Sequence, residues 1–173
     1  SKIYYYRSLP AEPRIPFDEV VLYQDDYLLV VDKPHFLPVT PAGRYLQETL
    51  LVRLKRSLGI DTLAPMHRID RETAGLVLFT IQPQTRNLYQ SLFRERSVSK
   101  EYEAIAAVRP GLELPATYRS RLVESAAFMK MCEIAGVPNS ETAITLLETR
   151  GDFGRYLLQP VSGQKHQLRA HMA

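Results

Sequence analysis

Residues 67–79 are His67-Arg68-Ile69-Asp70-Arg71-Glu72-Thr73-Ala74-Gly75-Leu76-Val77-Leu78-Phe79, a charged, turn-like segment that leads directly into an apolar run. The run from residue 75 to residue 81 is typical of a buried strand. Asp70 lies between Arg68 and Arg71, and nearby cations keep a carboxylate ionised. A carboxylate in a constrained loop beside a rigid strand is typical of a catalytic group. A helix cap or a surface ion pair with either arginine is the simpler alternative for Asp70.

Three further segments extend this pattern along the chain. They are Val30-Val31-Asp32-Lys33-Pro34, Ser99-Lys100-Glu101-Tyr102-Glu103-Ala104 and Gly163-Gln164-Lys165-His166-Gln167-Leu168-Arg169-Ala170-His171. Together with residues 67–79 they resemble, in order, the motifs of the RluA-like pseudouridine synthases, which isomerise uridine in RNA. Those motifs are a strand followed by Lys-Pro, then H-R-L/I-D-x-x-T/S-S/A-G-L, K-x-Y-x-A and G-R/Q/K-x-H-Q-I/L-R-x-H. Ala74 stands where serine is common, which removes at most one hydrogen bond.

The resemblance implies catalytic roles for three residues. Asp70 would be the carboxylate near the ribose and the base, acting either as a nucleophile or as a proton acceptor from the ribose. Tyr102 would stack against the uracil and help to remove its proton, and Arg169 would pair with Asp70. Taken alone, Tyr102 also fits a core residue with a satisfied hydroxyl, and Arg169 fits a solvated helix arginine.

RNA contacts are expected from several basic side chains. A uridine inside a stem must be flipped out before it can react. Arg68 would fill the vacated stack, as the resemblance implies for some relatives, or would pair with a phosphate. We predict phosphate contacts from Lys33, Lys100 and Lys165, and a further RNA contact from His166.

Composition permits this function without requiring it. The 173 residues suit one domain, and a net charge of +3 with a pI near 9.0 permits a polyanionic partner. The single cysteine, Cys132, excludes an internal disulfide and fits a reducing cytosol. No apolar run approaches the roughly 18 residues that a membrane span needs. We therefore expect a cytoplasmic, monomeric protein that acts on RNA and does not bind a membrane, a metal or a cofactor.

Hydrophobic periodicity favours an α+β fold with a twisted, mixed, largely antiparallel sheet and flanking helices. A hairpin is expected from residues 20–23 and 28–32. An amphipathic helix is expected at residues 46–58, closed by Gly59, with the run Arg53-Lys55-Arg56 on its solvated face. The other expected elements are strands at 75–81, 100–108, 118–124, 128–134, 142–149 and 155–161, a helix from Pro83 to about Arg96, and a last helix from about Gln164.

The two ends of the chain are expected to differ from the middle. Residues 1–19 contain Pro10, Pro13 and Pro16, which predict an extended N-terminal arm. Residues 20–173 would form the catalytic domain. We expect this domain to be incomplete at its C-terminus, because relatives continue beyond the last motif.

Two functions of other classes compete with the isomerase. One is a non-catalytic RNA-binding module or chaperone. The other is a metal-dependent hydrolase built on His67, Asp70, His166 and His171, although the sequence offers no compact ligand set for it. The motifs do not identify the uridine or decide between ribosomal and transfer RNA, because loops and stem shape set that choice.

Overall fold

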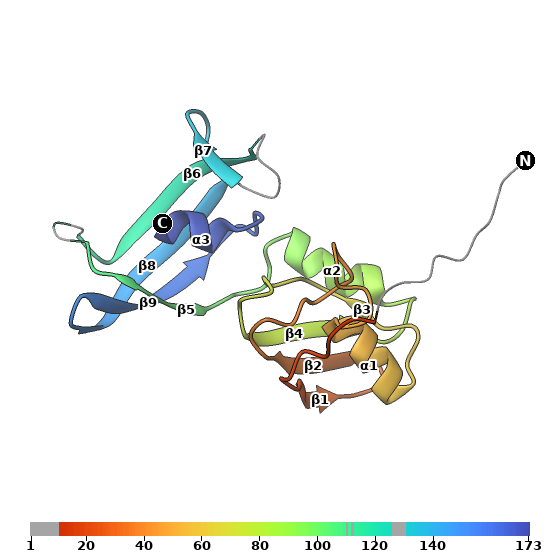
Figure 1. Ribbon diagram of the computed structural model, residues 1–173. Coiled ribbons are helices and arrows are strands. Elements are labelled where there is room, and N and C mark those ends of the chain that lie inside the picture. The colour runs from red at the N-terminus through yellow and green to blue at the C-terminus, as the bar shows by residue number, and fades with distance from the viewer. Residues whose placement is uncertain (1–10, 110, 112, 126–130) are drawn as a thin grey trace, which may run out of the picture. The chain divides into compact units, whose positions relative to one another are not determined.

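Strands pair antiparallel throughout the part of the chain that the structure, a computed structural model, describes (Figure 1). The described residues are 11–109, 111, 113–125 and 131–173. Contacts divide the chain into an N-terminal unit, Ser1–Arg94, and a C-terminal unit, Glu95–Ala173. Each unit combines its own sheet with at least one helix, which confirms the predicted α+β class. A single catalytic domain over residues 20–173 stays a prediction.

The N-terminal unit contains a four-stranded sheet in the order β1-β2-β4-β3. Its elements are β1 (Val20–Gln24), β2 (Leu28–Lys33), α1 (Leu50–Leu58), β3 (Ala64–Pro65), β4 (Gly75–Thr80) and α2 (Arg86–Arg94). The predicted hairpin is confirmed as β1 and β2, with the Asp25 carboxylate accepting from the backbone of Tyr27 and Leu28 at the turn. The two-residue strand β3 was not predicted, because so short a strand has no periodicity to detect.

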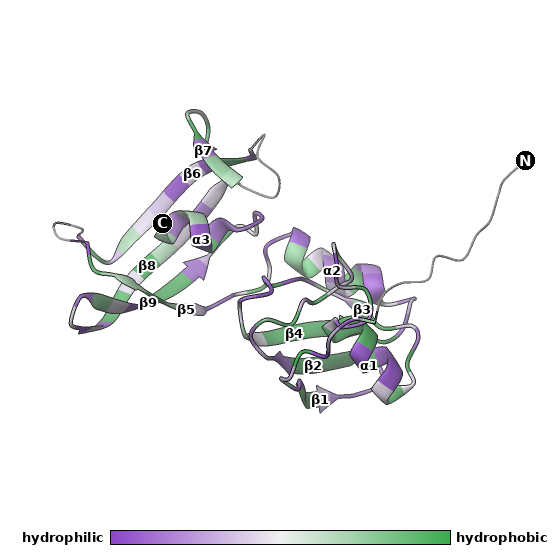
Figure 2. Ribbon diagram, in the orientation of Figure 1, coloured by the Kyte–Doolittle hydropathy of each residue, from purple (hydrophilic) through white to green (hydrophobic). Residues whose placement is uncertain are grey.

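The core of this unit lies between one face of the sheet and α1. Alternate residues of β2 and β4 are buried on that face, because successive side chains of a strand point to opposite faces of the sheet. Both strands are largely hydrophobic (Figure 2). Leu50 and Leu54, one turn apart on α1, complete the same cluster. The buried members are Leu29, Val31, Leu37, Val39, Leu50, Leu54, Leu63, Val77 and Phe79. This core places the start of β4, and hence the Asp70 loop before it, on a rigid base.

Helix α1 begins four residues later than predicted, at Leu50. The Thr49 hydroxyl caps it by accepting from the Val52 amide, and Gly59 closes it at φ +67°, as expected. Residues 46–48 have apolar and helix-favouring side chains, but their backbone amides all donate to the Glu12 carboxylate instead. This partner is 34 or more residues away, so periodicity could not reveal it.

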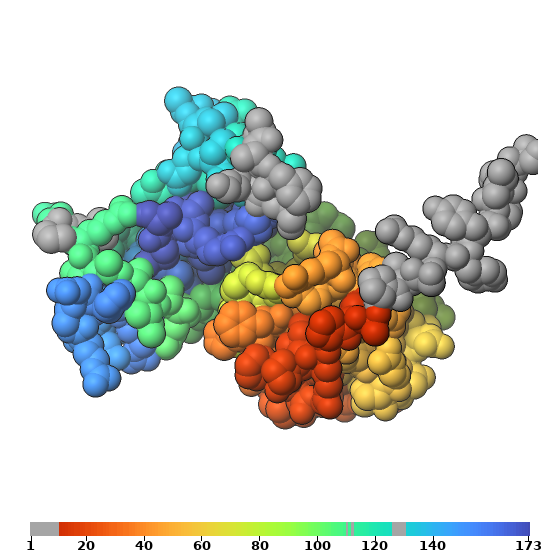
Figure 3. Space-filling view, viewed as in Figure 1, coloured from red at the N-terminus to blue at the C-terminus, as the bar shows by residue number. Residues whose placement is uncertain are grey.

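Residues 11–19, the described part of the predicted arm, contain no helix or strand and lie against the N-terminal unit (red in Figure 3). Arg53 of α1 holds this segment by donating to the carbonyl oxygens of Ile15 (2.7 Å) and Phe17 (2.8 Å). It also pairs with Glu48 and Glu19, and its side chain is only 11% exposed. The prediction that Arg53 belongs to a solvated face is therefore wrong, because the arm covers it.

The C-terminal unit contains a five-stranded sheet in the order β5-β9-β8-β6-β7, with one short helix. Its elements are β5 (Tyr102–Ala107), β6 (Ala116–Glu124), β7 (Met131–Ile134), β8 (Ser140–Arg150), β9 (Phe153–Pro160) and α3 (Gln167–Met172). The predicted strands are confirmed apart from their ends; residues 128–130 of the strand predicted at 128–134, like residues 1–10 of the arm, lie outside the described residues. In the described parts of both units, no helix is long and apolar enough to cross a membrane.

Candidate active site

Asp70 lies in the loop between β3 and β4, where its carbonyl oxygen accepts from the Thr73 amide (3.1 Å) to form a turn. His67, at the start of this loop, accepts from the Leu78 amide through Nε2 (3.3 Å) and stacks on Phe93 of α2, with ring centroids 4.8 Å apart. The loop is thus attached both to a core strand and to a helix. This is the constrained turn that the sequence predicted for Asp70.

Lys33 at the end of β2 is fully buried, and its ammonium donates to three carbonyl oxygens. The acceptors are those of Leu37 (2.7 Å), Pro34 (3.0 Å) and Arg71 (3.2 Å). Because an ammonium has three hydrogens, none is left for a ligand. The prediction that Lys33 contacts a phosphate is therefore wrong; it anchors the residue after Asp70 to β2.

The charge of Lys33 nevertheless acts on the candidate site. Burial lowers the pKa of Lys33 to about 8, and the negative charges of Glu72 and Asp70 oppose this fall. These opposing effects place the Lys33 ammonium within electrostatic reach of both carboxylates. Lys33 therefore contributes to the site through position and charge.

A second side chain connects the same two loops. His35 Nδ1 lies 2.6 Å from the Glu72 carbonyl oxygen, to which its N–H donates. Together with Lys33, it fixes residues 34–37 against residues 70–72. Arg68 is exposed beside this assembly, as an RNA-contacting side chain must be, whereas Arg71 pairs with the Glu72 carboxylate (2.8 Å).

Tyr102 is the first residue of β5, paired with Leu158 of β9. Residues of β5 alternate between half-buried and exposed, with Tyr102, Ala104 and Ala106 on the half-buried face as predicted. All three pack against the core of the C-terminal unit. Tyr102 is therefore partly a core residue, followed on the same face by two alanines.

The last motif forms α3 and the turn before it. His166 has a left-handed backbone (φ 54°) at the N-cap, so the helix begins at Gln167 and not near Gln164 as predicted. Arg169 points away from the buried side of the helix and is exposed. Lys165 pairs with Glu124 (3.0 Å), and Lys100 donates to the Ser162 carbonyl oxygen (3.2 Å). Both lysines thus have protein partners within their own unit.

Two buried polar residues of this motif attach α3 to the sheet, a role that sequence reasoning did not assign. Gln167 exchanges hydrogen bonds with Ser162 and Thr142, both at 2.8–2.9 Å. His171 lies between the hydroxyls of Ser140 (3.1 Å) and Thr142 (2.9 Å). Both residues belong to the G-x-x-H-Q-L-R-x-H motif and lie on the same short helix as Arg169. The motif was therefore the signal that could have identified them.

The predicted site residues are thus divided between the two units. Asp70, Arg68 and Lys33 belong to the N-terminal unit, and Tyr102, Arg169, Lys100, Lys165 and His166 belong to the C-terminal unit. The pairing of Asp70 with Arg169 beside Tyr102 stays a prediction. Within the described ranges, no three His, Cys, Asp or Glu side chains form a group that could hold a metal ion.

Comparisons with known proteins give a consistent result. The model of the RNA pseudouridylate synthase family matches residues 27–173. The chain is 30% identical over 156 residues to the mitochondrial tRNA pseudouridine(32) synthase of Saccharomyces cerevisiae, covering 88% of this chain and 34% of that protein. It is also 30% identical to the dual-specificity RNA pseudouridine synthase RluA of Escherichia coli K12, covering 94% of this chain and 73% of RluA.

A solved structure, human RNA pseudouridylate synthase domain containing 4, superposes with a TM-score of 0.67 at 29% identity. The match covers 87% of this chain and 62% of the human chain. The chain spans about a third of the yeast relative's length and about three quarters of RluA.

Proposed function

The chain belongs to the RNA pseudouridylate synthase family, and we propose that it converts a uridine in RNA to pseudouridine with Asp70 as the catalytic carboxylate. The match spans every site residue nominated from the sequence, from Lys33 to Arg169. Relatives named as transfer-RNA and dual-specificity RNA synthases support ribosomal or transfer RNA as the substrate class.

The reaction is a rearrangement within one nucleotide. The bond from the ribose C1′ to N1 of uracil breaks, the base turns, and a new bond forms from C1′ to C5. The hydrogen on C5 leaves as a proton and N1 gains one, so atoms and electrons balance without an oxidant or a group donor. The protein must therefore supply a positioned carboxylate, a proton acceptor for C5 and a cavity for the turning base.

One observation carries the proposal: the Asp70 loop is fixed to the core of the N-terminal unit by Lys33 and His67. A surface ion pair or a helix cap would need no buried lysine beneath it, because exposed pairs contribute little to stability. A catalytic carboxylate gains from such support, because its position must hold before the substrate arrives.

Tyr102 and Arg169 complete the proposed site. Tyr102 would stack on the uracil and take part in removal of the C5 proton, with space provided by the small residues along β5. Arg169 would lie within salt-bridge reach, about 4 Å, of the Asp70 carboxylate and hold it in one rotamer. Arg68 would occupy the gap left by the flipped uridine or bind a phosphate.

Tritium release tests the proposed reaction. Transcripts of transfer and ribosomal RNA are labelled with tritium at uracil C5 and incubated with the protein. The proposed enzyme, a cytoplasmic monomer without metal or cofactor, releases tritium into water at the same rate with and without a chelator. Binding of these transcripts without release would favour a non-catalytic RNA-binding module, and a loss of release with chelator would favour the metal-dependent class.

A further inference from the structure

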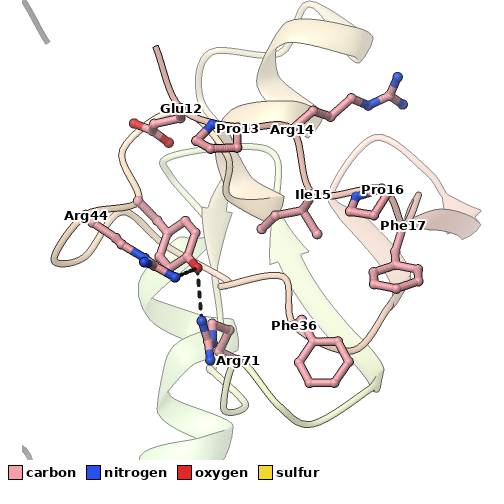
Figure 4. Close-up of a pocket in the computed structure, with 10 residues that line it drawn as sticks. Glu12, Pro13, Arg14, Ile15, Pro16, Phe17, Phe36, Arg44 and Arg71 are labelled. Carbon is pink, nitrogen blue, oxygen red and sulfur yellow. Dashed lines mark hydrogen bonds between the residues drawn. The ribbon is translucent and has the colours of Figure 1, made fainter. Parts of the chain in front are cut away.

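A pocket of about 350 Å³ lies in the N-terminal unit, bordered by the N-terminal arm and by Arg71 (Figure 4). Its walls come from the N-terminal arm, from the loops after β2 and from the residue that follows Asp70. The lining residues include Glu12, Arg14, Phe17, Phe36, Arg44, Tyr45 and Arg71. All of them belong to one unit, so the pocket does not depend on how the two units are placed.

Two arginines converge on one tyrosine at one side of this pocket. The Tyr45 hydroxyl accepts from Arg44 (2.7 Å) and from Arg71 (2.9 Å), shown as dashed lines in Figure 4. Both guanidinium carbons also lie over the Tyr45 ring, 4.9 and 5.7 Å from its centroid. Arg44 sits at the tip of a tight turn, where Ala42 and Tyr45 exchange backbone hydrogen bonds and Gly43 adopts φ +59°. The cationic side of the pocket is thus held in a defined geometry.

Two exposed aromatic rings form the opposite side. Phe17 is 46% exposed and Phe36 is 50% exposed, with ring centroids 6.2 Å apart. Phe36 has a left-handed backbone (φ 66°), a conformation that costs a non-glycine residue roughly 1–2 kcal/mol. The surrounding contacts keep it there, since Lys33 and His35 hold the residues on either side. Strained residues with exposed side chains are concentrated at ligand sites.

The charges of the pocket are unequal. Arg14 faces Asp18 and Arg71 faces Glu72, both at 2.8 Å. Arg44 has no carboxylate within salt-bridge distance in the part of the chain that the structure describes. Glu12 also lines the pocket, but its carboxylate accepts from the backbone amides of residues 46–48. Among the described residues, the pocket therefore combines one guanidinium that has no carboxylate partner with two apolar rings. A phosphate and a nucleobase on the same nucleotide match this combination.

We propose that this pocket is a nucleotide subsite: it holds a nucleotide of the RNA strand that carries the target uridine, with the base on Phe17 and Phe36 and the phosphate on Arg44. The identification of this strand as the substrate RNA rests on the proposed function. Arg71 follows Asp70 directly and lines the pocket, so the bound nucleotide lies beside the one that reacts. The subsite would position that strand and contribute to the choice of sequence around the uridine.

Binding of fluorescein-labelled decauridine, followed by fluorescence anisotropy over a series of salt concentrations, tests the subsite. Phe36→Leu keeps the apolar bulk but loses the aromatic face, and we expect its affinity to fall by roughly 5- to 100-fold, the loss of one stacked base. Arg44→Ala should reduce the slope of log affinity against log salt by about 0.7, the loss of one phosphate contact. Arg44→Lys should restore that slope.

Arg56→Ala is the matched control, because it removes an exposed arginine of α1 that lies outside the pocket. It should leave affinity and slope unchanged, and thermal unfolding of each variant checks that the fold is intact. If Arg44→Ala and Phe36→Leu bind as the wild type does while the wild type releases tritium, the subsite is wrong and the proposed function stands. If the two variants lose binding and the wild type releases no tritium from any transcript, the subsite stands and the proposed function is wrong.

Discussion

At the scale of single residues, Lys33 is a buried charged side chain whose ammonium binds three backbone carbonyl oxygens. Replacing it with methionine keeps most of the volume but leaves the carbonyl oxygens of Pro34, Leu37 and Arg71 without their donor. A buried group that loses its partner costs about 1–3 kcal/mol. We expect Lys33→Met to lower the free energy of unfolding by that order and to reduce tritium release, measured by urea unfolding and by the release assay.

Lys55→Met removes the same charge from α1 and should change neither quantity. A Lys33→Met protein as stable and as active as Lys55→Met would show that Lys33 does not support the Asp70 loop.

His171 makes the stability of the C-terminal unit depend on pH. Burial lowers the pKa of His171 below its ordinary 6.5, and the Glu133 charge opposes the shift only in part. Between the folded pKa and about 6.5, the unfolded chain therefore binds more protons than the folded protein. The contribution of neutral His171 is full above pH 6.5 and is lost as the pH falls through the folded pKa.

We expect the urea midpoint, followed by circular dichroism, to fall as the pH drops from about 7.5 to about 5. In His171→Gln this dependence should become shallower, whereas His35→Gln, which changes an exposed histidine of the other unit, should keep it. An unchanged pH dependence in His171→Gln would contradict the assignment.

At the scale of elements, the N-terminal arm is held by α1. Arg53→Ala removes the donor to the Ile15 and Phe17 carbonyl oxygens and leaves Glu48 without its cation. We expect the arm to loosen around Ile15 and Phe17, although Glu12 still binds residues 46–48. Trypsin should then cleave after Arg14 faster than in the wild type, measured as the rate at which a fragment beginning at Ile15 appears. Arg56→Ala, one turn along the same helix, should digest as the wild type does. Equal rates in the wild type and Arg53→Ala would mean that the arm is held elsewhere.

Periodicity was sufficient for every element except the two-residue strand β3 and was insufficient for where the elements begin and end. The β1–β2 hairpin, β4 and the α1 stop at Gly59 follow from local patterns, because alternation and glycine act within a few residues. The start of α1 depends on Glu12, and that of α3 on the His166 backbone, and neither is visible in a local pattern. For the same reason, the sequence identified Lys33 and Arg53 as charged but could not show that they are buried.

At the scale of the whole molecule, the motifs predict that residues distant in the sequence meet. Asp70 and Arg169 belong to different units, and nothing local brings them together. We expect a crystal structure of the protein to place the Arg169 guanidinium within about 4 Å of the Asp70 carboxylate, with the Tyr102 ring beside them. Asp70 and Arg169 on opposite faces of the protein would contradict the proposed site.

The variant Asp70→Asn tests whether Asp70 is the catalytic carboxylate. The amide keeps the shape of the side chain but can act neither as nucleophile nor as proton acceptor. The measurement is tritium release from uracil-labelled RNA by the wild type and by Asp70→Asn, with urea unfolding as a check that the fold is intact. We expect release by the wild type and none above background by a folded Asp70→Asn protein. Release by Asp70→Asn above about a few per cent of the wild-type rate would contradict the assignment of Asp70, because the loss of a catalytic group lowers the rate far below that level.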